Sequence, residues 1–349
     1  MSSRLDVIKR FSDLTPQEEL SGLVAQIRPY LRNVIGVTIG KGGVGKTTLA
    51  VNLSYTLAEL ERQRAESGKE ALPILYIEID SNGNSRLDLN IRGGEFDDNG
   101  KSFYEALTDD KPLKVIKDVR PYLDVVPSGS DNANISDQIS KLKESHGLSA
   151  FLALALLLAQ ISHLYRWIVI DFSPSDKSNQ RLGLSASTHL VSPVMGSDNG
   201  VIEGMGTLAQ LVAGIRVINP EVKIAAISFM GFKKVQGNGL SDLSILREKF
   251  ETLLSASKLD TGVIIDPFVR ESPYAPLCRN IGMPARELAI AATGELADDE
   301  GALIPRPRDE NDRLVDRDRS AGLANDYLEV AVQVIQRIRQ RNAVLEGAS

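Results

Sequence analysis

A glycine-rich loop between an apolar run and a helical pattern constrains the fold of this chain more than any other feature. The loop reads Gly40-Lys41-Gly42-Gly43-Val44-Gly45-Lys46-Thr47-Thr48, and it follows the apolar run Val34–Ile39. A helical pattern then runs from Thr47 to about Arg62. Two glycines at this spacing, followed by Lys-Thr between a strand and a helix, are typical of a phosphate-binding loop. The sequence therefore predicts a nucleotide-binding α/β core.

Each residue type in this loop has a chemical role. Glycines let backbone N–H groups turn toward phosphate oxygens at the positive end of a helix. Lys46 supplies positive charge beside the β- and γ-phosphates, and the Thr47 hydroxyl is a ligand for Mg²⁺. We therefore expect a nucleoside triphosphate with Mg²⁺ at this loop.

The rest of the chain alternates apolar, β-branched runs with helical patterns. Strands are predicted at Val34–Ile39, Pro73–Ile79, Leu123–Val126, Trp167–Ile170, Leu190–Val194, Val222–Phe229 and Gly262–Ile265. Helices are predicted at Thr47–Arg62, Ser149–Leu164, Gly204–Ile218 and Ser241–Leu254. Most of the apolar runs are continuous, which indicates strands buried on both faces. The pattern predicts an α/β fold with a doubly wound, mostly parallel sheet flanked by helices.

The two ends of the chain differ from this pattern. Thr15-Pro16-Gln17-Glu18 is a capping box that starts a helix ending near Leu31, so residues 1–32 are expected to form an N-terminal helical extension. Residues 33–341 are assigned to the α/β domain. Glu295–Arg319 is rich in charge and predicts a solvated or disordered loop insertion, and residues 342–349 predict a flexible tail.

Composition narrows the classes of function. With 42% apolar residues, the 349-residue chain can bury a large core. The single cysteine, Cys278, excludes an internal disulfide or a cysteine-only cluster within one chain. The net charge of −6 means that nucleic-acid binding would need a local basic patch. The oily segment Ala150–Ile161 is short and is interpreted as a core helix, so a cytoplasmic protein is expected.

Two aspartates follow apolar strands at the edge of the sheet where the loop lies. Asp171 ends the run Trp167–Ile170, and we expect it to hold Mg²⁺ directly or through water, as a Walker B aspartate does. Asp80 ends the run Ile74–Ile79 and is a candidate for positioning water, with an ordinary turn aspartate as the alternative. Glu78 lies two residues earlier, on the same face as Asp80.

Lys41 is a second lysine in the loop. Its charge beside Lys46 is unfavourable unless phosphate balances both. It is also placed to reach the nucleotide of a second subunit, as an arginine finger does. Lys41, Lys46 and Asp80 are therefore the candidate catalytic residues.

These motifs together resemble the deviant Walker A ATPases of the ParA/MinD superfamily, and most closely the ParA-like partition ATPases. The resemblance rests on Lys41–Thr48, Glu78–Asn84 and Asp171. Further similar segments are Tyr122–Ser128, Val191–Val194 leading to Glu203-Gly204, Asn219–Ile224, and Val269-Arg270 leading to Ala275-Pro276. The resemblance implies ATP as the nucleotide, an ATP-dependent sandwich homodimer, and a slow, partner-stimulated, Mg²⁺-dependent hydrolysis. It also implies that Lys41 acts across the dimer, that Asp80 orients the attacking water, and that Thr47 and Asp171 hold Mg²⁺.

The chain departs from the family pattern at three places. Glu78 replaces an aspartate, Ser81-Asn82 replaces proline-glutamine, and Phe172-Ser173 replaces threonine-proline. Losing a proline at position 81 is expected to make the loop after Asp80 more mobile and turnover slower.

The family implies several functions. ParA-like proteins bind DNA without sequence preference, and the candidate contacts here are Arg270, Arg279, Arg286, Arg337, Arg339 and Arg341. The expected function is partition of plasmid or chromosomal DNA with a ParB-like centromere-binding partner, at the nucleoid in the cytoplasm. A positioning ATPase for a protein cargo, such as a carboxysome, a chemoreceptor cluster or a conjugation complex, is the alternative. A membrane-surface regulator of the MinD type is the third hypothesis. It is disfavoured because the apolar stripe Leu328, Ala331, Val332, Ile335 and Ile338 lacks aromatic residues and is expected to pack on the core.

Overall fold

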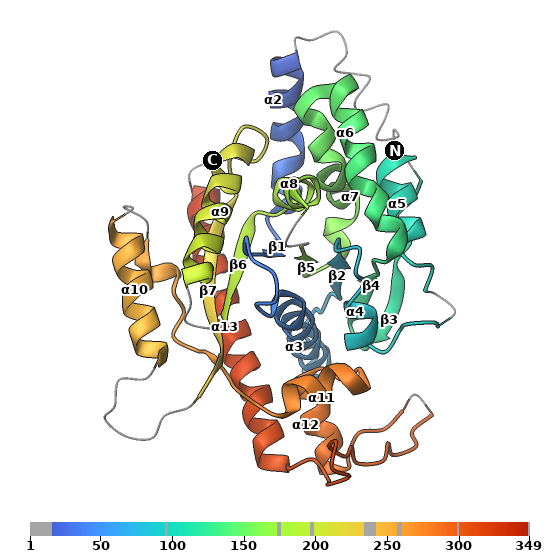
Figure 1. Cartoon of the computed structure of the whole chain (residues 1–349). Helices are drawn as coiled ribbons and strands as arrows, with labels where there is room; N and C mark the ends of the chain where they lie inside the picture. The colour runs from blue at the N-terminus through green and yellow to red at the C-terminus, as the bar shows by residue number, and fades with distance from the viewer. Residues whose placement is uncertain are drawn as a thin grey trace.

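One sheet organises the described part of the chain. The computed structural model describes residues 16–94, 97–109, 111–172, 176–195, 199–233, 242–256, 260–298 and 300–347. The strands are β1 (Val34–Val37), β2 (Ile74–Glu78), β3 (Ile116–Arg120), β4 (Leu123–Val126), β5 (Trp167–Asp171), β6 (His189–Met195), β7 (Lys223–Phe232) and β8 (Val269–Arg270). Their order in space is β3-β4-β2-β5-β1-β6-β7-β8, and only the edge pair β3–β4 is antiparallel (Figure 1).

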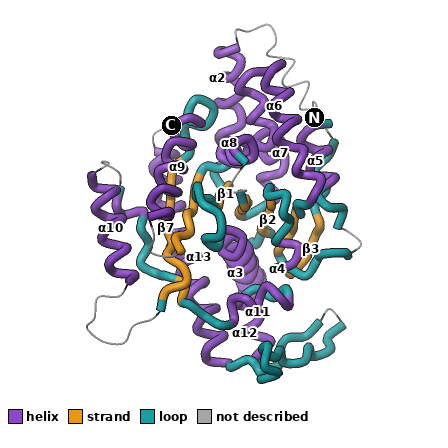
Figure 2. Tube along the Cα trace, in the orientation of Figure 1, coloured by secondary structure: helices purple, strands orange, loops and turns teal. Residues whose placement is uncertain are grey.

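Helices cover both faces of this sheet, as Figure 2 shows. One layer contains α2 (Pro16–Ile27), α5 (Lys101–Thr108), α6 (Ile135–His146), α7 (Ala153–Ile161), α8 (Lys177–Ala186), α9 (Asn199–Ile215) and α10 (Asp242–Ala256). The other contains α3 (Lys46–Glu66), α4 (Ser85–Asp88), α11 (Tyr274–Ile281), α12 (Ala285–Thr293) and α13 (Arg317–Gly347). Each layer closes its own apolar core against one face, so the predicted doubly wound α/β fold is confirmed.

The strand predictions differ from the structure at both ends of the sheet, because the edge strands β3 and β8 are absent from them. Leu123–Val126 is predicted with the bounds that the structure has. Gly262–Ile265 is wrong as a strand: Thr261–Val263 forms a 3₁₀ turn, and Ile264 makes only an isolated bridge to Ile227. The Asp260 carboxylate accepts a hydrogen bond from the Gly262 N–H at 2.8 Å, which favours the turn over a strand.

The oily segment near residue 150 belongs to the core. Gly147–Leu164 has a mean hydropathy of 1.8 over 18 residues, and within the described residues it is the one helical segment long and apolar enough to cross a membrane. It is broken into a 3₁₀ helix (Gly147–Leu152), α7 and a second 3₁₀ helix (Ser162–Leu164). Leu152, Leu154 and Leu158 are fully buried in the same core as α2, α5 and α8. The packing agrees with the core-helix interpretation.

The N-terminal extension packs on the main core. Thr15 of the predicted capping box lies outside the described residues, and α2 is followed by a 3₁₀ helix at Arg28–Leu31. Arg28 is buried and donates a hydrogen bond to the Ser185 carbonyl at 2.6 Å. Burial lowers the pKa of Arg28 to about 10, against the opposing charge of Glu221. The extension therefore shares the core of the sheet.

The C-terminal boundaries need correction. The charged loop expected at Glu295–Arg319 ends before Arg317, where α13 begins, and its described residues are tied by the bridges Ala297–Leu303 and Arg308–Leu314. The tail expected from residue 342 is wrong as far as Gly347, because α13 continues to that residue. Asn342 donates to the Arg32 carbonyl at 3.1 Å. The local sequence does not predict this long-range contact.

Candidate nucleotide site

The phosphate-binding loop leaves β1 and closes over the start of α3. Gly45 precedes α3 with φ of +79°, and Gly43 has φ of +71°, a left-handed conformation that glycine adopts without strain. A side chain at Gly40 would lie 2.7 Å from the Gly204 carbonyl, which instead accepts a hydrogen bond from the Gly40 N–H at 3.2 Å. Helix α9 therefore supports one side of the loop.

Lys46 points into the arch of this loop. Its Nζ donates to the Lys41 carbonyl at 2.7 Å, and the residue is only 6% exposed. Burial lowers the pKa of Lys46, while the charges of Asp171 and Asp80 raise it. The ammonium is thus stored inside the loop, where phosphate oxygens can replace the carbonyl as its partner.

Asp171 lies beneath the loop at the end of β5. Burial raises the pKa of this carboxyl to about 7, which the Thr47 hydroxyl, Lys46 and Tyr76 counteract and Asp80 reinforces. Its Oδ2 accepts a hydrogen bond from the Tyr76 hydroxyl at 3.3 Å, whereas its buried Oδ1 has no hydrogen-bond partner in the described part of the chain. A buried carboxylate oxygen without a partner, beside a threonine hydroxyl, fits the oxygen ligands that Mg²⁺ prefers.

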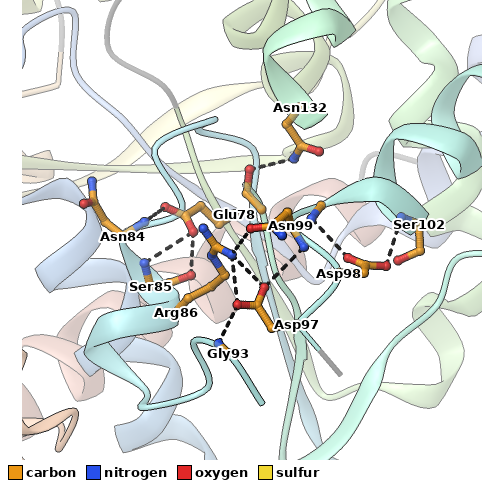
Figure 3. Close-up of polar contacts among 12 residues, drawn as sticks. Glu78, Asn84, Ser85, Arg86, Gly93, Asp97, Asp98, Asn99, Ser102 and Asn132 are labelled. Atoms are coloured by element: carbon orange, nitrogen blue, oxygen red, sulfur yellow. Dashed lines mark hydrogen bonds and ion pairs between the residues drawn. The ribbon is translucent and has the colours of Figure 1, made fainter. Parts of the chain in front are cut away.

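Glu78 faces Asp171 across the β2–β5 pair. Its Oε1 accepts from the Asn84 N–H at 2.8 Å, and its Oε2 accepts from Ser85, at 3.3 Å from the N–H and 2.6 Å from the hydroxyl (Figure 3). Burial, followed by the charge of Asp171, raises the pKa of Glu78 well above its usual range. Glu78 thereby holds the start of α4, directly after the turn that carries Asp80.

The segment after Asp80 is also braced from its far side. Arg86 donates to both carboxylate oxygens of Asp97, at 2.7 and 2.9 Å, and to Asn99 at 2.8 Å, as Figure 3 shows. Asp80 is 6% exposed, and its Oδ1 accepts from the Asn82 N–H at 3.2 Å. Asp80 therefore stabilises a turn, and it also lies near Lys46 and Asp171. This position fits both an ordinary turn aspartate and the predicted role in positioning water.

A pocket of about 460 Å³ continues from the loop along α3. Its lining includes Thr48 and Asn52 from α3, Met195 from the end of β6, and Met230 and Gly231 from β7. A nucleoside joined to phosphates on the loop would extend into this space. Sequence reasoning missed these residues, although Met195 ends β6 and Met230 pairs with it near the end of β7, at the edge of the sheet where the loop lies.

Lys41 lies at the foot of the loop against α9. A side chain added at Gly204 would come within 3.1 Å of the Lys41 Cβ, so glycine at that position leaves room for the lysine. The side chain is half-buried in the single chain. Its action on the nucleotide of a second subunit stays a prediction.

The first three candidate DNA-contacting arginines have acidic partners in the chain. Arg270 forms two hydrogen bonds to Asp326, at 2.6 and 2.7 Å, and Arg286 lies 3.9 Å from Glu59. Arg279 is 46% exposed and contacts two residues of the segment after Asp80, Asn84 at 2.5 Å and Asp88 at 3.5 Å.

The other three candidates lie on α13. Arg341 donates to the Thr188 carbonyl at 2.9 Å, to His189 Nδ1 at 3.0 Å and to the Glu221 carbonyl, all at or before the start of a strand. Arg339 is exposed and Arg337 is half-buried. Arg341 is therefore at the amino-terminal edge of the sheet, whereas Arg270 and Arg279 are at the carboxyl-terminal edge. The six arginines do not form one patch on a single chain, and Arg341 is committed to internal contacts.

A mostly parallel sheet with a glycine loop after its central strand, a buried lysine in that loop and an aspartate at the next strand end defines a P-loop nucleotide-binding protein. The model of the AAA_31 family, described as an AAA domain, matches residues 32–224, more than half of the 349-residue chain. The chain belongs to this family and is a P-loop ATPase of the ParA/MinD type.

Relatives in sequence include a chromosome partitioning protein and a sporulation initiation inhibitor protein. The chain is 28% identical over 198 residues to the chromosome partitioning protein ParA of Myxococcus xanthus, covering 56% of this chain and 63% of that protein. It is 29% identical over 187 residues to the sporulation initiation inhibitor protein Soj of Bacillus subtilis, covering 53% of this chain and 65% of that protein. These matches span less than two thirds of the length of either relative.

Solved structures share the fold. Apo McdA of Cyanothece has a TM-score of 0.60 and 16% identity, covering 85% of this chain and 99% of that one. The septum site-determining protein MinD of Pyrococcus horikoshii, complexed with Mg-ADP, has a TM-score of 0.55 and 14% identity, covering 86% and 95%. At these identities the likeness establishes the fold.

Proposed function

We propose that this protein is an ATPase that dimerises with ATP, binds DNA without sequence preference, and partitions or positions plasmid or chromosomal DNA with a ParB-like partner. The observation that carries the catalytic part is the buried arrangement of Lys46, Thr47 and Asp171 beneath the glycine loop. The relation to partition proteins in sequence supports the cellular role.

The residues present fit a magnesium nucleotide. Thr47 and the unpartnered Oδ1 of Asp171 would hold Mg²⁺, which when bound neutralises charge on the phosphate oxygens. Lys46 would exchange the Lys41 carbonyl for a phosphate oxygen. Asp80 would orient the attacking water, and Lys41 would act on the nucleotide of the second subunit. The MinD structure that shares this fold holds Mg-ADP, which supports a magnesium nucleotide as the ligand here.

DNA binding in an acidic protein requires local charge. Arg279 and Arg339 are exposed, and they are the strongest of the six candidates on the surface of one chain. Dimerisation would double the number of these arginines, so ATP would control DNA affinity by bringing the arginines of two subunits together. If about three arginines of each subunit contacted DNA, the dimer would neutralise roughly six phosphates, and the slope of log affinity against log salt would be near −5. We propose a cytoplasmic, nucleoid-associated location on this basis.

The alternatives differ in the surface that they need. The apolar stripe expected on α13 is largely in the core, since Ala331, Ile335 and Ile338 are buried while Val332 is 38% exposed. This packing disfavours membrane attachment through α13 as in the MinD hypothesis. A positioning ATPase for a protein cargo would use the same nucleotide chemistry with a different adaptor, and the fold shared with McdA is compatible with it.

Co-sedimentation with non-specific DNA tests the proposal. DNA should retain the protein with ATP and Mg²⁺ and release it with ADP or without nucleotide. Replacing Arg279 and Arg339 by alanine should weaken retention and flatten the salt dependence, while R341A tests a residue committed to internal contacts. Equal retention in all three nucleotide conditions would overturn ATP-controlled DNA binding. ATP hydrolysis measured on the same samples separates that outcome from a failure of the ATPase assignment.

A further inference from the structure

The Asp171 carboxylate is asymmetric in its contacts. Oδ2 accepts the Tyr76 hydroxyl at 3.3 Å, and Oδ1 has no hydrogen-bond partner in the described residues, although the side chain is fully buried. A carboxylate with both oxygens free could rotate about its Cβ–Cγ bond. The Tyr76 hydroxyl on Oδ2, together with the Thr47 hydroxyl that also interacts with this carboxyl, fixes the plane of the carboxylate and thus the direction in which the other oxygen points.

Tyr76 is suited to this task by its place in the sheet. It lies on β2 two residues before Glu78, on the face that packs against α3, and it is fully buried. Its ring is held by the apolar residues of that core, so the hydroxyl is placed by a rigid strand rather than by a loop. The core could be filled by phenylalanine at this position, yet the chain carries a buried hydroxyl aimed at an acid.

The same hydroxyl touches the segment that follows Asp80. Ser85, the first residue of α4, lies within hydrogen-bonding reach of the phenol and donates to Glu78 at 2.6 Å. The Tyr76 hydroxyl therefore lies between Asp171 and Ser85, which is hydrogen-bonded to Glu78.

We propose that Tyr76 is a positioning residue for the metal carboxylate: its hydroxyl holds Oδ2 of Asp171 so that Oδ1 faces the Mg²⁺ that accompanies the nucleotide. This rests on the proposed function, because it requires that Asp171 bind Mg²⁺. Residues that hydrogen-bond a metal ligand typically change metal affinity by about 10–100-fold when they are removed. Tyr76→Phe removes the hydroxyl and keeps the ring.

The test uses a fluorescent methylanthraniloyl derivative of ADP as the probe. Probe affinity is measured in EDTA and then across a Mg²⁺ titration, with the full chain and no hydrolysis. Y76F should bind the probe in EDTA as the wild type does, and should need about tenfold more Mg²⁺ to reach half of the metal-dependent gain in affinity. In Y76F, only the orientation of the Asp171 carboxylate is expected to change.

A matched control is available at the opposite edge of the sheet. The Tyr165 hydroxyl donates to Asp124 at 3.0 Å, so Y165F removes the same kind of bond at a distance from the loop. Y165F should leave the Mg²⁺ requirement unchanged. In an Asp171→Ala background, which removes the acceptor, Y76F should cause no further increase, because Tyr76 acts through that carboxylate.

The outcomes are separable. An unchanged Mg²⁺ requirement in Y76F would overturn the positioning role, as would loss of probe binding in EDTA, which would make Tyr76 a core residue only. An equal rise in Y165F would likewise assign the effect to stability. If the wild-type chain shows no Mg²⁺-dependent gain at all, the proposed nucleotide function fails, independently of Tyr76.

Discussion

Glu78 lies directly opposite Asp171 in the register of β2 and β5, and both carboxylates are fully buried. Their surroundings differ: the oxygens of Glu78 accept hydrogen bonds from Asn84 and Ser85, whereas Oδ1 of Asp171 has no hydrogen-bond partner among the residues that the structure describes. The pair therefore divides two tasks between neighbouring strands. Glu78 anchors the segment after Asp80, and Asp171 faces the phosphate loop.

Lys46→Ala should abolish nucleotide binding. The ammonium is buried within the loop, so removing it leaves the phosphates without their central cation. Isothermal titration with ATP and Mg²⁺ checks this. The exposed Lys69 supplies the control, since K69A should bind as the wild type does. Retained ATP affinity in K46A would show that the loop does not hold phosphate.

Asp80→Ala should leave ATP binding and dimerisation intact and stop hydrolysis. The carboxylate lies near Lys46 and Asp171 but is not needed to hold the loop itself. Phosphate release and size-exclusion chromatography with ATP measure the two properties separately. Asp98, which caps the backbone at Gly100 and Ser102, is the matched control, and D98A should still hydrolyse ATP. An active D80A would restrict Asp80 to its turn.

Lys41→Ala should bind nucleotide and lose cooperative hydrolysis. The reason is that its proposed target is the nucleotide of the second subunit, where such a cation contributes about 10³–10⁵ in rate. Hydrolysis rate is measured against protein concentration. Wild-type activity should rise more steeply than linearly, and K41A activity should be low throughout. Full cooperative activity in K41A would remove the lysine from the catalytic group.

Arg341→Ala should destabilise the fold, whereas Arg339→Ala should not. Arg341 joins α13 to Thr188, His189 and the Glu221 carbonyl, and losing these bonds costs roughly 1–3 kcal/mol. Arg339 is exposed, and a surface substitution is usually within about 0.5 kcal/mol. Urea unfolding compares the two neighbours on one helix. Equal stabilities would contradict the anchoring role.

His189 should make stability fall at acid pH. Burial, together with the Arg341 charge, lowers the pKa of this imidazole to about 3. A depressed folded-state pKa means that the stabilisation is present above the unfolded value near 6.5 and is lost as pH falls toward 3. Each pH unit in that window costs up to about 1.4 kcal/mol. The unfolding free energy of His189→Gln should therefore depend less on pH between 4.5 and 6.5 than that of the wild type, and parallel curves would refute this assignment.

Sequence reasoning predicted the nucleotide core because its signals are local. The loop from Gly40 to Thr48, the apolar runs and the acids that end them lie within short windows, and strand periodicity fixes which edge they share. The fold class followed from the same pattern. The edge strand β3 was missed because Ile116–Arg120 is partly exposed and lacks a continuous apolar run.

Contacts between distant segments could not be predicted in this way. The commitment of Arg341 to the start of β6 spans about 150 residues, and the pairing of Arg270 with Asp326 joins two elements that are separate in the chain. The sequence shows that an arginine is charged, but it does not show which residue the arginine contacts. The packing of the helices therefore decides which of the six arginines considered for DNA binding are exposed and which are held by internal contacts.

The chemistry of the loop was determined by the sequence itself, because glycine, lysine and threonine at fixed spacing leave few alternatives once a strand precedes and a helix follows. Only the tertiary structure decided that Glu78 and Asp171 have different roles. Register between β2 and β5 sets Glu78 against Asp171, and packing brings the Tyr76 hydroxyl to one oxygen of that carboxylate. Hydrogen-bond geometry depends on distances of a few tenths of an ångström between strands, which no single stretch of sequence encodes.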